Sequence, residues 1–130
     1  MDASGLPSAP TTEHLRDIME FTVHQEGDVA IVVLHGELDV ALAPKLKALL
    51  KDTIEKGHKK IVVDMKDVLF VDSSCLGVMV NAHKMAVGQN AAIKFAQSSE
   101  QVRKIFELTR TDKHLSFHAT LGEAIKSFGS

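Results

Sequence analysis

The sequence predicts an α/β domain with a mixed, mostly parallel sheet of four to five strands and about four helices. Strand and helix signals alternate in the order strand, strand, helix, strand, helix, strand, helix, strand, helix. Two predicted strands, residues 29–34 and 61–63, are continuously apolar, which is the pattern of parallel strands covered on both faces. A chain of 130 residues is long enough for one such domain with a core of its own.

The first two strands are predicted to pair antiparallel. In residues 21–26, Phe21, Val23 and Gln25 alternate with Thr22, His24 and Glu26, which is typical of a half-exposed strand. Residues 26–28, Glu-Gly-Asp, form a tight turn, and the continuously apolar run 29–34 follows it. We expect the first helix to begin near Pro44 and to end near Gly57. Its apolar stripe comprises Leu42, Leu46, Leu49, Leu50 and Ile54.

Three more strands complete the predicted sheet. The apolar run 61–63 predicts a third, buried strand, residues 92–96 predict a fourth strand, and residues 115–118 predict a short edge strand. Crossovers between parallel strands are right-handed. We therefore expect the crossover helices on one face of the sheet unless the strand order reverses.

Two capping boxes mark the last two helices. Ser98 with Gln101 has the spacing in which each side chain satisfies a free N–H group at a helix start, and Thr120 with Glu123 repeats it. The inward-facing residues of the two helices are predicted to be Val102, Ile105 and Phe106 in the first, and Leu121, Ala124, Ile125 and Phe128 in the second.

Composition and charge exclude several classes of function. The chain is 45% hydrophobic and 25% charged, and its formal net charge of −2 gives no electrostatic basis for binding nucleic acid or an anionic membrane. No apolar run approaches the length of a membrane span. Cys75 is the only cysteine, which excludes an internal disulfide and favours the cytoplasm. We expect a flexible N-terminal tail over residues 1–17 and the domain over residues 18–130.

The most informative segment, residues 71–78, lies between a buried strand and an apolar helix. It places Asp72, Ser73 and Ser74 at the start of that helix, where backbone N–H groups have no intrahelical partner and negative charge is favoured. Two interpretations follow from these residues alone. In the first interpretation, Ser73 and Ser74 are helix caps. In the second, one of the two serines accepts a phosphate.

Seven short motifs follow one another along the chain, and two of them lie in the segment 71–78: Gly36-Glu37-Leu38-Asp39, Ala43-Pro44, Ile61-Val62-Val63-Asp64, Val71-Asp72-Ser73-Ser74, Leu76-Gly77, Leu108-Thr109 and Leu121-Gly122-Glu123-Ala124. Together they resemble the STAS domain, and within it the bacterial anti-sigma factor antagonists. In that family an Asp-Ser-Ser/Thr/Ala-Gly-Leu-Gly segment carries a regulatory phosphoserine. The resemblance covers about residues 20–128 and implies a STAS-like single domain.

The resemblance implies partner switching. An unphosphorylated antagonist captures an anti-sigma factor that is also a serine kinase, and this frees a sigma factor for transcription. The kinase then phosphorylates the antagonist, here by position at Ser73 with Ser74 as the runner-up, and a metal-dependent serine phosphatase resets it. The alternative function is a non-switching STAS scaffold module of a stressosome-like complex or of a lipid-transport ATPase.

The same resemblance predicts a partner-facing surface that includes Asp39, Asp72, Ser74, Cys75 and Gly77. For Asp39 the alternative is an ordinary turn or capping carboxylate. Cys75 stands where antagonists usually have glycine or alanine. Near a helix N-terminus its thiol pKa could fall and give a reactive thiolate. In the alternative interpretation, the side chain packs under the loop as a small hydrophobe.

The helix after Ser73 carries two apolar stripes. Leu76, Met79, Val80, His83 and Val87 form the predicted core face. The second stripe, Val78, Ala82 and Met85, lies almost opposite and is predicted to be an exposed docking surface. The alternatives are that a neighbouring helix or a weak homodimer contact covers it.

The residues do not suggest an enzyme. Ser73 does not lie in a Gly-x-Ser-x-Gly elbow, and the chain has neither a P-loop nor a dinucleotide-binding motif. Seven histidines are scattered without zinc-ligand spacing, so we expect no metal and no cofactor. A nucleophilic pair of Cys75 with His83 is the remaining catalytic alternative.

Overall fold

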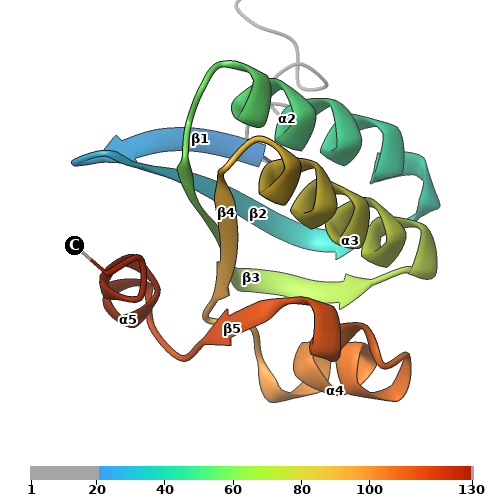
Figure 1. Ribbon diagram of the computed structural model, residues 1–130. Coiled ribbons are helices and arrows are strands. Elements are labelled where there is room, and N and C mark those ends of the chain that lie inside the picture. Colours follow the sequence, from blue (N-terminus) through green and yellow to red (C-terminus); the bar gives the residue numbers. More distant parts are fainter. Residues whose placement is uncertain (1–20, 130) are drawn as a thin grey trace, which may run out of the picture.

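A computed structural model of the chain describes residues 21–129, and in it five strands form one sheet in the order β1-β2-β3-β4-β5 (Figure 1). β1 and β2 pair antiparallel and all other neighbours pair parallel, which confirms the predicted mixed, mostly parallel sheet. The strands are β1 (Phe21–Glu26), β2 (Val29–Leu38), β3 (Lys60–Val71), β4 (Ala92–Ala96) and β5 (Ser116–His118).

Four α-helices and two short 3-10 helices complete the described part of the chain. They are η1 (Val40–Leu42), α2 (Ala43–Glu55), α3 (Ser73–Gly88), α4 (Glu100–Leu108), η2 (Thr111–His114) and α5 (Leu121–Lys126). The strand order never reverses, and α2, α3 and α4 all contribute to one core cluster. α5 covers part of the opposite face (Figure 1). This arrangement confirms the expectation from right-handed crossovers.

The inner strands supply both core clusters because they are covered on both faces. In β3, Ile61 and Val63 belong to the large cluster under α2, α3 and α4, while Val62 faces the small cluster under α5. Phe95 and Phe106 are fully buried, and the ring of Phe117 lies 5.6 Å and 4.9 Å from theirs, centroid to centroid. Aromatic packing of this kind holds α4 against the end of the sheet.

The helix boundaries agree with those predicted from the sequence except at the start of α4 and at the end of α5, which ends at Lys126, before Phe128. Pro44 lies in the first turn of α2, and Gly57 follows its last turn with a φ of +95°. The capping box predicted for Ser98 is wrong. α4 begins one residue later, and the Ser99 hydroxyl accepts the N–H of Val102 at 3.1 Å. At the second box the Thr120 hydroxyl accepts the N–H of Glu123 at 3.0 Å, as expected.

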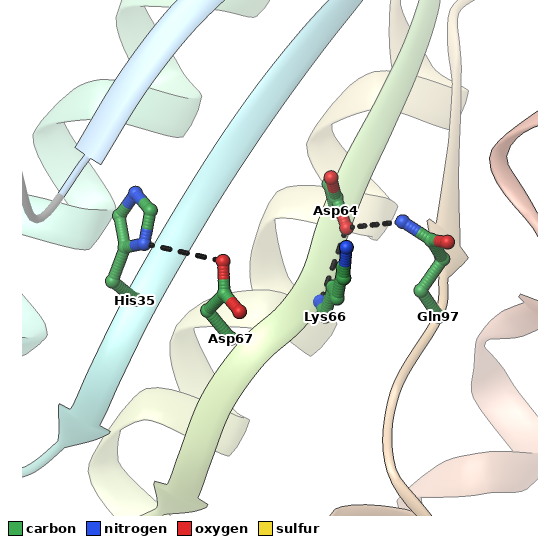
Figure 2. A network of polar contacts seen from close by, with 5 residues as sticks. All are labelled: His35, Asp64, Lys66, Asp67 and Gln97. Atoms are coloured by element: carbon green, nitrogen blue, oxygen red, sulfur yellow. Dashed lines mark hydrogen bonds and ion pairs between the residues drawn. The ribbon is translucent and has the colours of Figure 1, made fainter.

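β3 extends well beyond the apolar run that predicted it, through a charged stretch in which the carboxylates of Asp64 and Asp67 have partners (Figure 2). Asp64, only 9% exposed, accepts hydrogen bonds at 3.0 Å from the Lys66 backbone and from the Gln97 side chain. Asp67 Oδ2 lies 3.7 Å from His35 Nδ1 on the adjacent strand. These contacts allow the strand to continue to the edge of the sheet where Asp72 follows.

The expected flexible tail, residues 1–17, lies outside the described residues, as do residues 18–20 and Ser130. Among residues 21–129, no helix is long and apolar enough to cross a membrane.

Candidate functional site

Two acidic residues meet where neighbouring parallel strands end. Asp39 directly follows β2 and Asp72 directly follows β3, and the last residues of these strands, Leu38 and Val71, are paired. The backbone N–H of Asp72 donates to the carbonyl of Leu38 at 2.9 Å. The two loops therefore lie side by side at the carboxyl edge of the sheet, where functional loops of α/β proteins gather.

Asp39 has a capping role at this edge. Its Oδ1 accepts the backbone N–H groups of Ala41 at 3.0 Å and Leu42 at 3.3 Å, which stabilises the start of η1. The capping alternative for this residue is confirmed. Contact of Asp39 with a partner stays a prediction.

Asp72, rather than either serine, caps α3. Its Oδ1 accepts the backbone N–H of Ser74 at 2.7 Å and also the Ser74 hydroxyl. The interpretation of Ser73 and Ser74 as caps is therefore wrong. The Ser74 hydroxyl bond, followed by the backbone bond, lowers the pKa of the Asp72 carboxyl below its usual range, so Asp72 stays charged at neutral pH.

The two serines differ in accessibility. Ser73 is the first residue of α3 and is exposed, and its hydroxyl has no hydrogen-bond partner among residues 21–129. Ser74 is half-buried and its hydroxyl is held by Asp72. A reagent approaching from solvent therefore meets the Ser73 hydroxyl first, beside N–H groups of the helix N-terminus that favour an added negative charge.

Cys75 lies beneath this surface and is fully buried. Its Sγ donates to the carbonyl of Asp39 at 3.4 Å. This hydrogen bond connects the start of α3 to the loop that follows β2. Burial, and after it the Asp72 and Asp39 carboxylates, raises the pKa of the Cys75 thiol to about 11. The reactive-thiolate alternative is not compatible with this setting, and the expected partner contact of the Cys75 side chain is wrong because the side chain is covered.

We expect Cys75 in the native protein at about pH 8 to react with iodoacetamide at least about a hundredfold more slowly than in the urea-unfolded chain. The folded thiol loses its proton near 11 rather than 9.0, and it is also shielded from solvent. The folded state holds this proton more tightly than the unfolded state. The thiol therefore contributes stability below about pH 9, and this contribution is lost as the pH rises through 11. Mass spectrometry of timed aliquots gives both rates, and equal rates would contradict the burial.

A groove of about 270 Å³ runs along α3 from Ser73, between α3 and α2. Two lysines of α2 and seven residues of α3 line it: Lys47, Lys51, Ser73, Ser74, Gly77, Val78, Asn81, Ala82 and Met85. Lys47, Lys51 and Asn81 were not among the site residues predicted from the sequence. The only signal for the two lysines is their i, i+4 spacing, which puts them on one side of α2.

The predicted division of α3 into a core stripe and an exposed stripe is partly wrong. The residues that α3 buries are Cys75, Leu76, Met79, Ala82 and Ala86. Ala82 is only 6% exposed and Val87 is 58% exposed, the reverse of the prediction. α3 packs against α2 as well as the sheet, so its buried arc is rotated toward α2. Val78 and Met85 are half-buried in the groove, and Ala82 forms part of its floor.

The site contains no arrangement typical of metal chemistry. Within residues 21–129, no three His, Cys, Asp or Glu side chains are grouped so that they could hold a metal ion. His83 comes from the same helix as Cys75 but lines a different depression, near η2. The geometry of the described residues instead offers an exposed hydroxyl at one end of a partly apolar groove.

This chain belongs to the STAS domain family, whose family model matches residues 20–124. The anti-sigma-B factor antagonist of Bacillus subtilis is 34% identical to it over 84 residues, which cover 65% of this chain and 75% of that protein. The crystal structure of TM1081 from Thermotoga maritima has a TM-score of 0.77 at 29% identity and covers 82% of this chain and 92% of that one. Unphosphorylated SpoIIAA, an anti-sigma factor antagonist, shares the fold with a TM-score of 0.71 at 23% identity, covering 83% and 95% of the two chains.

Proposed function

We propose that this protein is an anti-sigma factor antagonist that binds an anti-sigma factor with serine kinase activity and is released when Ser73 is phosphorylated. The observation that carries the proposal is the position of Ser73. Its hydroxyl is exposed at the first residue of α3 and at the end of the α2–α3 groove, whereas Ser74 is tied to Asp72. The name of the Bacillus subtilis relative and the existence of SpoIIAA structures in an unphosphorylated and a phosphorylated form support it.

The mechanism needs no rearrangement of the domain. A phosphate on Ser73 adds about −1.5 to −2 charges at neutral pH, and the N-terminus of α3 tolerates them. Asp72 and Asp39 already make the carboxyl edge of the sheet acidic. Lys47 and Lys51 of α2, in contrast, border the groove that begins at Ser73. An acidic partner surface held by the lysines would be repelled by the new phosphate. Charge alone then converts a binding surface into a non-binding one.

The proposal is tested by incubating the full chain with the candidate anti-sigma factor, with and without ATP. We expect a stable complex without ATP, and with ATP a single added phosphate that peptide mapping places on Ser73. Phosphate on Ser74 alone, or on neither serine, would exclude the assignment of Ser73. A chain that binds no anti-sigma factor and takes up no phosphate would instead favour the scaffold alternative.

Met85→Lys is expected to weaken binding of the anti-sigma factor at least about tenfold, or ~1.4 kcal/mol. Met85 is half-buried and lines the groove together with the two lysines and Asn81, so an added ammonium group replaces apolar contact surface with charge. Isothermal titration calorimetry measures the affinity. The matched control is Val87→Lys, two residues along the same helix, 58% exposed and outside the groove. Equal losses for both variants would exclude the groove as the docking surface.

A further inference from the structure

We propose that the acidic N-terminal segment of this chain, residues 1–20, docks in the α2–α3 groove and competes there with the partner. The docking follows from the charge and the apolar character of the groove and of the segment itself. The competition rests on the proposed function. The segment would act as an intramolecular ligand that lowers the affinity of the free protein for any partner using the same groove.

The groove selects an occupant that is both acidic and apolar. Lys47 and Lys51 are exposed at its border, and neither has an ion pair or a hydrogen bond within residues 21–129. Val78 and Met85 present half-buried apolar side chains, and Asn81 offers an amide. Among the described residues, no acidic side chain lines the groove. Carboxylates therefore suit its border and apolar side chains suit its floor.

The N-terminal segment has this composition. Residues 1–20 contain four acidic side chains and one arginine, and three of the acidic residues, Glu13, Asp17 and Glu20, fall in the half nearest the domain. Leu15, Ile18 and Met19 lie among them. The STAS match begins only at residue 20, so nearly the whole segment is additional to the family domain.

The chain leaves the domain at the right place for this contact. β1 runs antiparallel to β2, and its first residue, Phe21, pairs with Leu34, which lies four residues before Leu38, the last residue of β2. Phe21 also packs against the core cluster that α2 and α3 cover. The segment is therefore attached beside the carboxyl half of β2, the strand that ends next to Asp39.

The distance is within reach. The eight residues 13–20 span up to about 26 Å when extended, comparable to the whole of α3, whose 16 residues extend over about 24 Å. Tethering also raises the effective concentration of the segment at the groove to about the millimolar range, so weak charge and apolar contacts suffice.

Paramagnetic relaxation in the full chain tests the docking. A nitroxide attached at Thr12→Cys, in a Cys75→Ala background, is expected to broaden the amide signals of Gly77 and Asn81 while leaving Lys126 on the far face sharp. Lys47→Glu with Lys51→Glu should abolish the broadening. The matched pair Lys104→Glu with Lys113→Glu, exposed lysines outside the groove, should not.

A second measurement keeps Cys75 unchanged. In the otherwise wild-type chain, Glu13→Lys, Asp17→Lys and Glu20→Lys together should shift the Gly77 and Asn81 signals, while Asp2→Lys should leave them in place. Absence of both the broadening and the shifts would overturn the docking. A mixture of nitroxide-labelled chain and unlabelled, isotope-enriched chain reports contacts between molecules. If the broadening arises only between molecules, the docking within one chain is overturned, because the groove would then hold the segment of a second copy.

The competition has its own readout. The triple tail variant should bind the anti-sigma factor at least about threefold more tightly than the wild type, because the intramolecular competitor is lost. Unchanged affinity alongside the expected broadening would overturn the competition and leave the docking in place. Failure of both forms to bind any anti-sigma factor would count against the proposed function, and the relaxation measurement would still decide the docking.

Discussion

Phosphorylation of Ser73 is expected to weaken binding of the anti-sigma factor at least about a hundredfold, or ~2.7 kcal/mol, and Ser73→Glu about tenfold. The phosphate adds about −1.5 to −2 charges, and like charges brought together at an interface cost several kcal/mol. Glutamate supplies one charge and fewer acceptor oxygens, so its effect is smaller. Ser73→Ala should keep wild-type affinity and resist release by the kinase.

The fold should not change in any of these forms. Ser73 is exposed, and a negative charge at the N-terminus of α3 interacts favourably with the helix, so circular dichroism and the melting temperature should stay near wild type. Calorimetric titration of the free, phosphorylated and substituted chains measures the affinities. Asn90→Asp adds one charge at the opposite end of α3 and serves as the control. Equal affinity of the phosphorylated and free proteins would exclude partner switching.

Phe106→Ala is expected to lower the free energy of unfolding by about 3–5 kcal/mol, the largest stability effect among these predictions. Phe106 is fully buried, and its ring contacts that of Phe117 edge to face at 4.9 Å. Removing it leaves a cavity between α4 and the end of the sheet, in addition to the lost transfer free energy. Urea unfolding followed by circular dichroism measures the difference.

Leu108→Ala, in the same helix, is the control for Phe106→Ala. Leu108 is 84% exposed, so its truncation should change the free energy of unfolding by no more than about 0.5 kcal/mol. A loss below about 1.5 kcal/mol for Phe106→Ala would contradict its place in the core. Partner binding should be retained by the folded fraction, because α4 contributes no residue to the groove.

The local sequence was sufficient to predict the order and type of the elements. The continuously apolar run 29–34 predicted a strand covered on both faces, and Pro44 and Gly57 predicted the limits of α2. The antiparallel start and the edge position of β5 also followed from the sequence. These features depend on a few neighbouring residues, whose turn geometry and periodicity are the same in any fold. The full length of β3 was not predicted, because its charged residues do not fit the pattern of a buried strand. The partners that allow them there, His35 on β2 and Gln97 after β4, are distant in the sequence.

At the site, the sequence determined which residues lie at the carboxyl edge of the sheet, because parallel strands bring Asp39 and Asp72 together wherever β2 and β3 pair. The bond from the Ser74 hydroxyl to Asp72 joins residues two apart, so it is a local contact, but the residue pattern left open which of Asp72, Ser73 and Ser74 caps the helix. Only the tertiary structure decided that α2 supplies two lysines to the groove and that Ala82 is buried while Val87 is not. A helix with apolar residues on two sides has no unique core face of its own. The position of the neighbouring helix sets that face, and the sequence of α3 contains no information about that position.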